Sequence, residues 1–248
     1  MSNSIRPLGD EAQGGHDGHV ASRSIAPRTP ATALSPLQLE DRATIYRTDA
    51  ARREVDAFRE LRTQLLSVAE GNFITLVAPV SPGSGGSFVA RNLAVAVAFD
   101  ETKSALLIDC DLRQPTQDRT MKLAADGGGL VDYLEDQERS TESVLYDTGV
   151  PRLRLLPAGR TRETGSEYFS SFRMRLLLDS LRSRYPNCHL FLDAPPVRGA
   201  PDARILSELA DVVVLVAGYG RDTPATIAQA AANFDPKKFA GVVFNEGV

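Results

Sequence analysis

Short apolar runs alternate with longer helical stretches from residue 73 onward, and this alternation constrains the fold more than any other feature of the sequence. The strand-like runs cover residues 73–79, 104–111, 152–159, 189–196, 211–218 and 240–248. The helical stretches between them cover residues 87–100, 127–136, 170–185, 202–209 and 223–234. Strands joined through helices need crossover connections, so the pattern predicts an α/β fold with a mostly parallel central sheet and helices on both faces.

The start of the chain lacks this pattern. Residues 1–45 mix Pro, Gly, Ser and Ala with scattered charge, a composition that cannot bury enough apolar surface to offset its ordering entropy. We therefore expect a disordered tail over residues 1–45 and one folded domain over residues 46–248. That domain opens with an amphipathic helix, because apolar residues recur there at helical spacing: Val55, Phe58, Leu61, Leu65 and Val68.

Composition excludes several classes of function. The formal net charge of −4 argues against nucleic acid as a partner, because the surfaces of proteins that bind nucleic acids are basic. Two cysteines and three histidines without ligand spacing predict neither a disulfide framework nor a zinc site. Because no apolar run is long enough for a signal peptide or a membrane span, we expect a cytoplasmic protein.

A glycine-rich loop follows the first predicted strand. The stretch "VSPGSGGSF" lies between that strand and a helix, where backbone amides and the helix N-terminus suit an anion. The usual phosphate-binding pattern ends in Gly-Lys-Ser/Thr, but here Gly86 stands in place of the lysine, and Ser87 stands where the Mg²⁺-binding hydroxyl would be. Plain turns also join strands to helices with Gly, Ser and Pro, so the loop alone leaves both interpretations open.

Two further strands end in carboxylates. Asp109 and Asp111 end the run "LLIDCD", and Asp193 follows "LFL". A single aspartate at such a place is often a helix cap, but ligands of parallel sheets bind at the carboxyl ends of strands, where all three features converge. The set predicts a nucleotide–Mg²⁺ site in a P-loop NTPase-like three-layer sandwich. ATP or ADP would contact Gly83, Ser84, Gly85, Gly86, Ser87 and Phe88; Ser87, Asp109 and Asp193 would hold Mg²⁺; Asp109, Asp111 and Asp193 would be catalytic.

Residues 50–248 resemble the bacterial tyrosine kinases of capsule and exopolysaccharide export. The matching motifs are "DAFRELRTQL", "SPGSGGSFVARNLA", "LLIDCDLRQP" with Arg113, "LFLDAPPVRGAPDARIL" and "GVVFN". The resemblance implies that Asp56, Arg59 and Arg62 make subunit or partner contacts, and that Asn245 contacts the base.

Three departures from the family pattern imply impaired catalysis. No lysine remains in the loop, since Ser81 occupies the position of the second, signature lysine of related partition ATPases. The six tyrosines are scattered, and no tyrosine-rich C-terminal cluster follows the last strand. The segment after "LPAG" reads "RTRETGSEYFSS" where prolines are expected. Arg91, one helical turn beyond Ser87, is expected to point off the site. Nucleotide would then bind weakly or not at all.

The resemblance implies a pseudokinase that regulates production of a surface polysaccharide: a capsule, a biofilm matrix or an adhesive holdfast. It would act on a membrane polysaccharide co-polymerase encoded as a separate chain, which recruits it to the inner membrane, and it could form homo-oligomers. Two alternatives stay open. One is an active Mg-ATP-dependent tyrosine kinase or ATPase; the other is a nucleotide-gated positioning ATPase of the partition or cell-division type.

Overall fold

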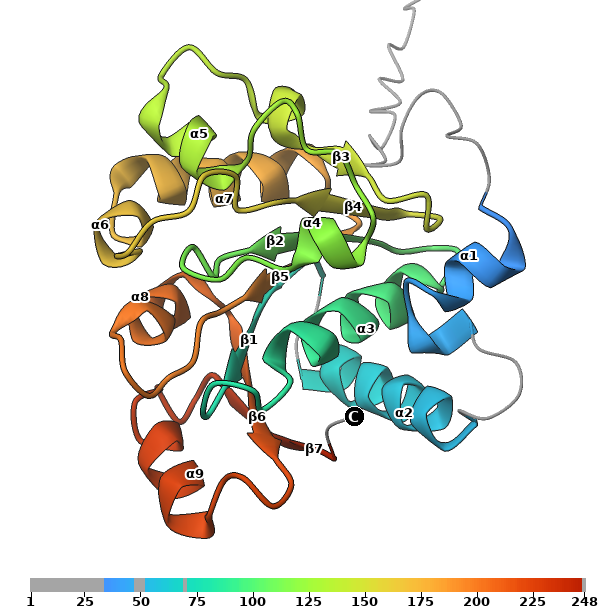
Figure 1. Ribbon diagram of the computed structural model, residues 1–248, viewed down its shortest axis with the longest axis vertical. Helices are drawn as coiled ribbons and strands as arrows, with labels where there is room; N and C mark the ends of the chain where they lie inside the picture. The colour runs from blue at the N-terminus through green and yellow to red at the C-terminus, as the bar shows by residue number, and fades with distance from the viewer. Residues whose placement is uncertain (1–33, 47–51, 69–70, 247–248) are drawn as a thin grey trace, which may run out of the picture.

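A seven-stranded sheet forms the centre of the protein (Figure 1). The computed structural model describes residues 34–46, 52–68 and 71–246. The strands are β1 (Ile74–Pro79), β2 (Ser104–Asp109), β3 (Tyr146–Asp147), β4 (Leu153–Leu156), β5 (Cys188–Asp193), β6 (Val212–Gly218) and β7 (Phe239–Asn245). Their order is β3-β4-β2-β5-β1-β6-β7, and every neighbouring pair is parallel except β3 with β4. The predicted mostly parallel sheet is confirmed.

Helices cover both faces of the sheet and make the three-layer sandwich. One face carries α2 (Arg52–Val68) and α3 (Gly86–Ala98), together with α1 (Pro36–Glu40), η1 (Thr44–Tyr46) and α4 (Gln117–Thr120). The opposite face carries α5 (Leu130–Glu135), α6 (Ser166–Phe169), α7 (Phe172–Arg184), α8 (Asp202–Leu209) and α9 (Pro224–Ala231), with η2 (Thr141–Val144) beside α5. Each layer packs on the sheet through its own cluster of buried apolar side chains.

The central elements are apolar because both sides of them are covered. All six residues of β1, β2 and β5 are buried, which explains why these strands read as continuous apolar runs without alternation. Helix α3 is buried along nearly its whole length, between the sheet and α2. Phe58 of α2 meets Phe88 of α3 edge to face, with ring centroids 5.9 Å apart. This packing fixes the start of α3, where the glycine-rich loop enters.

The structure departs from the predicted tail boundary at residue 45. Residues 34–45, assigned to the tail, contain α1 and the first part of η1, while residues 1–33 lie outside the described residues. Ser35 and Gln38 form a capping box at the start of α1. The backbone N–H of Thr44 donates to Asn92 Oδ1 of α3 at 2.7 Å, and Lys122 pairs with Asp41 at 2.9 Å. These contacts make the segment part of the domain.

Two smaller differences concern single elements. The stretch predicted as one helix over residues 170–185 is preceded by a separate turn, α6, and α7 begins only after Ser171, whose hydroxyl caps it. The short antiparallel strand β3 was not predicted. Among the helices of the described residues, none has both the length and the apolar character to span a bilayer.

Candidate phosphate-binding site

The ends of three adjacent parallel strands bring the predicted site residues together. Asp109 of β2 lies directly beside Asp193 of β5 in the sheet register, and β1 runs next to β5. The loop after β1 and the segments after β2 and β5 surround a cleft of about 360 Å³. The predicted residues that line it are Gly83, Gly85, Gly86, Ser87, Phe88 and Asp111. The other predicted site residues lie behind or beside this lining: Ser84, Asp109, Asp193 and Asn245.

The glycine-rich loop presents the start of α3 to the cleft. Gly83 and Gly85 have φ angles of 80° and 88°, in the left-handed region that favours glycine. Gly85 is the N-cap of α3, and no side chain of the described residues caps the helix. The first amides of α3 therefore retain hydrogen-bonding capacity toward the cleft, and the helix dipole adds partial positive charge there. This geometry suits a phosphate group.

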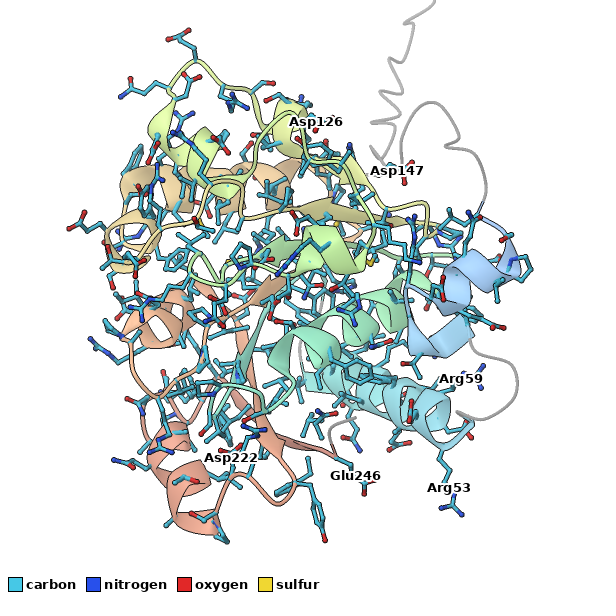
Figure 2. The ribbon with its side chains drawn as sticks, in the orientation of Figure 1. Arg53, Arg59, Asp126, Asp147, Asp222 and Glu246 are labelled. Carbon is cyan, nitrogen blue, oxygen red and sulfur yellow. The ribbon has the colours of Figure 1, made fainter. Side chains whose placement is uncertain are left out.

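A network behind the loop holds its shape. Ser84, predicted to contact nucleotide, is fully buried: its hydroxyl lies 2.6 Å from Asp222 Oδ2 and accepts from the Ser81 N–H at 3.1 Å. Partial burial acts to raise the pKa of Asp222, but hydrogen bonds from Ser81, Ser84 and the Gly218 amide outweigh it and lower that pKa. Figure 2 labels Asp222 near this turn. Ser84 therefore supports the loop and does not face the cleft.

Asn245 also contacts the loop. Its Nδ2 donates to the carbonyl of Ser84 at 3.2 Å. A Cβ atom at Gly85 would overlap the Asn245 amide, so glycine is required there for space as well as for its φ angle. The predicted contact with a base stays a prediction; the contact present is with the phosphate loop.

The position of the missing lysine is closed by a neighbouring side chain. A Cβ atom at Gly86 would lie 2.6 Å from Cδ, 2.7 Å from Cγ and 2.9 Å from Cβ of Pro79, the last residue of β1. The general pattern also places a glycine six residues before the lysine, and here that residue is Val80, fully buried. Pattern comparison could have identified Val80, but nothing in the sequence pointed to Pro79.

The carboxylate of Asp109 accepts hydrogen bonds from the protein backbone. Its two carboxylate oxygens accept the N–H groups of Asp111 at 3.1 Å and of Thr116 and Gln117 at 3.0 Å. Burial raises the pKa of Asp109 well above its ordinary value, and the neighbouring Asp193 raises it further, against the opposing effect of these backbone donors. Asp109 therefore organises the turn that leads into α4.

Asp193 is fully buried beside it. Burial raises the pKa of Asp193 to about 6, although hydrogen bonds from Gln117 and Ser87 and the charge of Arg91 act in the opposite direction. Its Oδ2 accepts from Gln117 Nε2 at 2.6 Å, while its Oδ1 has no hydrogen-bond partner among the described residues. Asp193 and Ser87 are thus close together, as a metal-binding pair would be, but Gln117 lies against both.

Gln117 and Arg91 are site residues that the sequence prediction missed or misplaced. The fully buried Gln117 donates from Nε2 to the carbonyl of Ser87 at 3.0 Å, and its Oε1 accepts from Arg91 Nη1 at 3.4 Å. Arg91 does not line the cleft, yet it is only 9% exposed and its charge acts on Asp193. It therefore lies directly behind the site and is not turned away from it.

The expected Mg²⁺ ligands differ in how far other groups of the protein already engage them, and their role as metal ligands stays a prediction. Asp109 accepts three backbone N–H groups. Gln117 Nε2 donates to the backbone carbonyl of Ser87 and to Asp193 Oδ2, so it engages neither the Ser87 hydroxyl nor Asp193 Oδ1. In the described part of the chain, no group of three His, Cys, Asp or Glu side chains is placed to hold a metal ion. Asp111 does line the cleft, but its Oδ1 accepts the backbone N–H of Gln114 at 3.0 Å.

Two arginines bring positive charge to the lining of the cleft. Arg113, from the segment after β2, and Arg198, from the segment after β5, are both exposed and line the cleft. Neither forms a salt bridge with another described residue. Their guanidinium groups are available to an anionic ligand, since arginine keeps its charge at all relevant pH values.

The predicted contact residues of α2 lie apart from the cleft. Asp56 and Arg59 form an exposed pair at 3.3 Å, and Figure 2 shows Arg59 at the outer edge of the molecule. Arg62 instead donates to the Ala96 carbonyl of α3 at 3.3 Å. Arg62 therefore bonds within the domain, whereas Asp56 and Arg59 remain on the surface.

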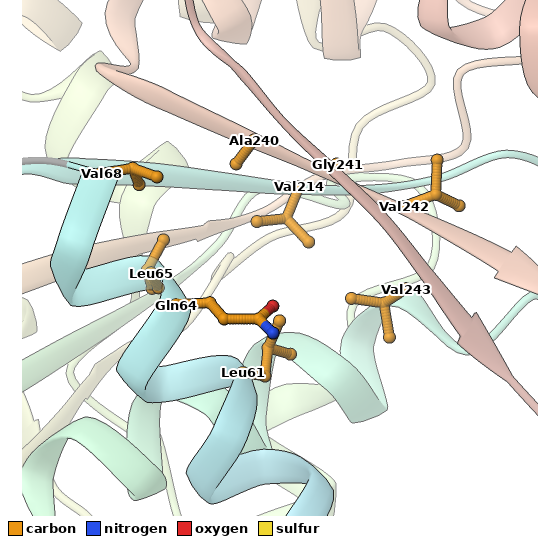
Figure 3. A pocket seen from close by; sticks show the side chains of 9 residues that line it. All are labelled: Leu61, Gln64, Leu65, Val68, Val214, Ala240, Gly241, Val242 and Val243. Atoms are coloured by element: carbon orange, nitrogen blue, oxygen red, sulfur yellow. The ribbon is translucent and has the colours of Figure 1, made fainter.

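A second hollow, of about 90 Å³, lies between α2 and strands β6 and β7 (Figure 3). Its lining consists of Leu61, Gln64, Leu65, Val68, Val214, Ala240, Gly241, Val242 and Val243. This lining contains no charged side chain. The hollow is therefore unsuited to a phosphate group, unlike the cleft beside α3, which combines helix amides with Arg113 and Arg198.

Comparisons with known proteins agree with this geometry. No protein-family model matches the chain. Tyrosine-protein kinase Ptk of Acinetobacter johnsonii is 32% identical over 170 residues, which cover 67% of this chain and 22% of Ptk, so the chain spans little more than a fifth of that relative. The solved BceF tyrosine kinase domain is 33% identical with a TM-score of 0.66, covering 77% of this chain and 76% of that domain.

A more distant structure supports the fold alone. The cell division ATPase MinD of Pyrococcus furiosus aligns with a TM-score of 0.56 at 19% identity, over 70% of each chain. Ptk shares sequence with this chain, and the BceF domain shares both sequence and overall architecture with it. The chain belongs to the bacterial tyrosine kinase family.

Proposed function

We propose that this chain is a tyrosine-kinase-like regulator in which phosphoryl transfer is impaired. The observation that carries the proposal is the contact between Gly86 and Pro79, which leaves no room for a side chain at the lysine position. Phosphoryl transfer depends on cations placed at the developing charge, and losing one preorganised donor costs about 10²–10³ in rate. Restoring the lysine would therefore take more than one substitution, because Pro79 would also have to move.

Nucleotide binding is a separate property, and we propose that the cleft keeps it. The amides at the start of α3 do not depend on a lysine, and Arg113 and Arg198 supply positive charge in the same cleft. ATP or ADP would bind more weakly than in a loop with its lysine. In this role the chain senses nucleotide without turning it over at a useful rate.

The partner of this regulator would be a membrane polysaccharide co-polymerase on a separate chain. This part of the proposal rests on the family and on α2, where Asp56 and Arg59 form an exposed pair able to meet a partner or a second copy. Docking there would recruit the chain to the cytoplasmic side of the inner membrane. The process regulated would be export of a capsule, exopolysaccharide or holdfast-type polymer.

The direct test is a phosphorylation assay with three proteins. Purified wild type and Gly86→Lys should both show negligible autophosphorylation and ATP turnover with Mg²⁺. The double variant Pro79→Gly/Gly86→Lys removes the ring that occupies the space of the lysine stem, and we expect it to gain measurable turnover. Wild-type phosphorylation that disappears in Asp193→Ala would contradict the proposal and identify an active kinase.

A further inference from the structure

A polar side chain from outside the phosphate loop packs against Gly83, whose φ angle of 80° lies in the left-handed region. A Cβ atom at this glycine would lie 3.0 Å from both Cζ and Nη1 of Arg221, which belongs to the turn after β6. The same Nη1 donates to the carbonyl of Pro82, the residue before the glycine, at 3.1 Å. Arg221 therefore holds the peptide group that joins Pro82 to Gly83.

This pair of contacts recurs two residues further along the loop. Gly85 has a φ angle of 88°, and a Cβ atom there would overlap the amide of Asn245, the last residue of β7. Nδ2 of Asn245 donates to the carbonyl of Ser84, again the residue before the glycine, at 3.2 Å. Because neither glycine has a Cβ atom, both side chains can reach a loop carbonyl.

Holding a carbonyl also sets the direction of the N–H group in the same peptide. In a trans peptide the two groups point in opposite directions within one plane, and the described residues contain no cis peptide bond. The N–H groups of Gly83 and Gly85 therefore point away from the side chains that hold their peptides. Neither N–H has a hydrogen-bond partner among the described residues. Both glycines line the cleft, whereas Arg221 and Asn245 do not.

The sheet supports both of these side chains. The N–H of Tyr219, in the turn that carries Arg221, donates to the carbonyl of Asn245 at 2.8 Å, so the ends of β6 and β7 are linked. In the same turn, Asp222 Oδ2 lies 2.6 Å from the hydroxyl of Ser84. The phosphate loop is thus held from outside by residues that follow or end two strands.

We propose that Arg221 and Asn245 are positioning residues of the phosphate loop: they turn the N–H groups of Gly83 and Gly85 into the cleft, where these amides bind oxygen atoms of a phosphate chain. This inference rests on the proposed nucleotide binding and adds which side chains make the loop a phosphate site without its lysine. Backbone N–H groups that converge on a concavity form an anion site, and the first amides of α3 extend it. The loop then recognises the phosphate chain and not the base, so inorganic pyrophosphate is a ligand as well as ADP.

Titration calorimetry with pyrophosphate and with ADP tests this inference, because only ADP carries a base. We expect Arg221→Ala and Asn245→Ala to weaken both ligands equally, by about 2- to 10-fold, the factor that one hydrogen bond contributes. Arg175→Ala and Asn233→Ala, at exposed positions outside the cleft, are the matched controls and should bind as wild type does.

Three calorimetric results would contradict the inference. Weaker ADP binding with unchanged pyrophosphate binding in Asn245→Ala would assign Asn245 to the base and overturn its positioning role. Wild type that binds ADP but not pyrophosphate, or unchanged affinities in both variants, would overturn the inference and leave the nucleotide site standing. No binding of either ligand to wild type would overturn it together with the proposed nucleotide site.

Nuclear magnetic resonance with isotope-labelled glycine gives a readout that a merely structural role would not change. Charge-assisted hydrogen bonds are short and strong, so the amide protons of Gly83 and Gly85 should move downfield when pyrophosphate is added to wild type. Arg221→Ala should reduce the shift of Gly83 and leave that of Gly85, and Asn245→Ala should do the reverse. Arg221 lies in an exposed turn, so its variant should fold. Full shifts in both variants would overturn the inference.

Discussion

Replacing Gly86 by alanine places one methyl group at the position where the family carries its lysine. The new Cβ would lie 2.6–2.9 Å from three carbon atoms of Pro79, whereas carbon atoms normally approach to about 3.5–4.0 Å. The proline ring is rigid and buried, so overpacking should cost about 1–3 kcal/mol. Alanine gains up to about 1 kcal/mol over glycine in a helix. The net effect should be a loss of about 1–2 kcal/mol in the free energy of unfolding.

Urea unfolding of four proteins measures this: wild type, Gly86→Ala, Pro79→Gly and the double variant. The single alanine variant should also lose about 2–8 °C in melting temperature. In the Pro79→Gly background the same alanine should be neutral or stabilising, giving a coupling energy of about 1–3 kcal/mol. If Gly86→Ala has the same effect with and without Pro79, the ring does not close the lysine position, and the reasoning is refuted.

Three further predictions concern groups behind the loop. The folded-state pKa of Asp193 is raised from 3.8 to about 6, so the folded protein binds that proton more tightly, and stability should fall as pH rises through this window. Asp193→Asn should remove that loss and be more stable than wild type above pH 6, by up to about 3 kcal/mol in urea unfolding; an unchanged pH profile would contradict this. Arg91→Met removes a buried positive charge that favours the ionised form of Asp193, so the pKa of Asp193 should rise further and the fall in stability should extend to higher pH; an unchanged pH profile would show that Arg91 does not act on Asp193. Ser84→Ala removes the hydroxyl between Ser81 and Asp222 and should cost about 1–3 kcal/mol, while Ser170→Ala, an exposed hydroxyl, should stay within about 0.5 kcal/mol; equal effects would refute the bracing role of Ser84.

The sheet could be predicted because its strands have an unambiguous signature. β1, β2 and β5 are buried at every position, so burial on both faces appears in the sequence as unbroken apolar runs separated by helical stretches. Segment 34–46 was missed because its helices are short and depend on contacts such as Thr44 with Asn92. The capping box from Ser35 to Gln38, with Pro36 beside it, was a local signal that could have identified α1.

The site could be predicted only where a residue follows a strand directly. Asp109 and Asp193 end β2 and β5, so their meeting follows from the parallel register. Gln117 follows Asp109 by eight residues, and its place depends on the turn that Asp109 itself organises through backbone hydrogen bonds. The contact of Pro79 with Gly86 depends on how the loop returns over the strand end. The spacing of apolar residues in the sequence predicts neither the position of Gln117 nor the contact between Pro79 and Gly86.

The loss of the lysine is therefore matched by structure on both sides of the loop. Removing a long side chain from a close-packed region would by itself leave a void or unpaired polar groups, and both are costly. Pro79 instead fills the space at Gly86, and Gln117 joins the backbone carbonyl of Ser87 to Asp193 Oδ2. These two replacements do not touch the amides at the start of α3. The geometry for holding a phosphate can thus persist after the groups that transfer one are gone, so binding and turnover should respond to different substitutions: binding to Arg198, and turnover to the pair Pro79 and Gly86.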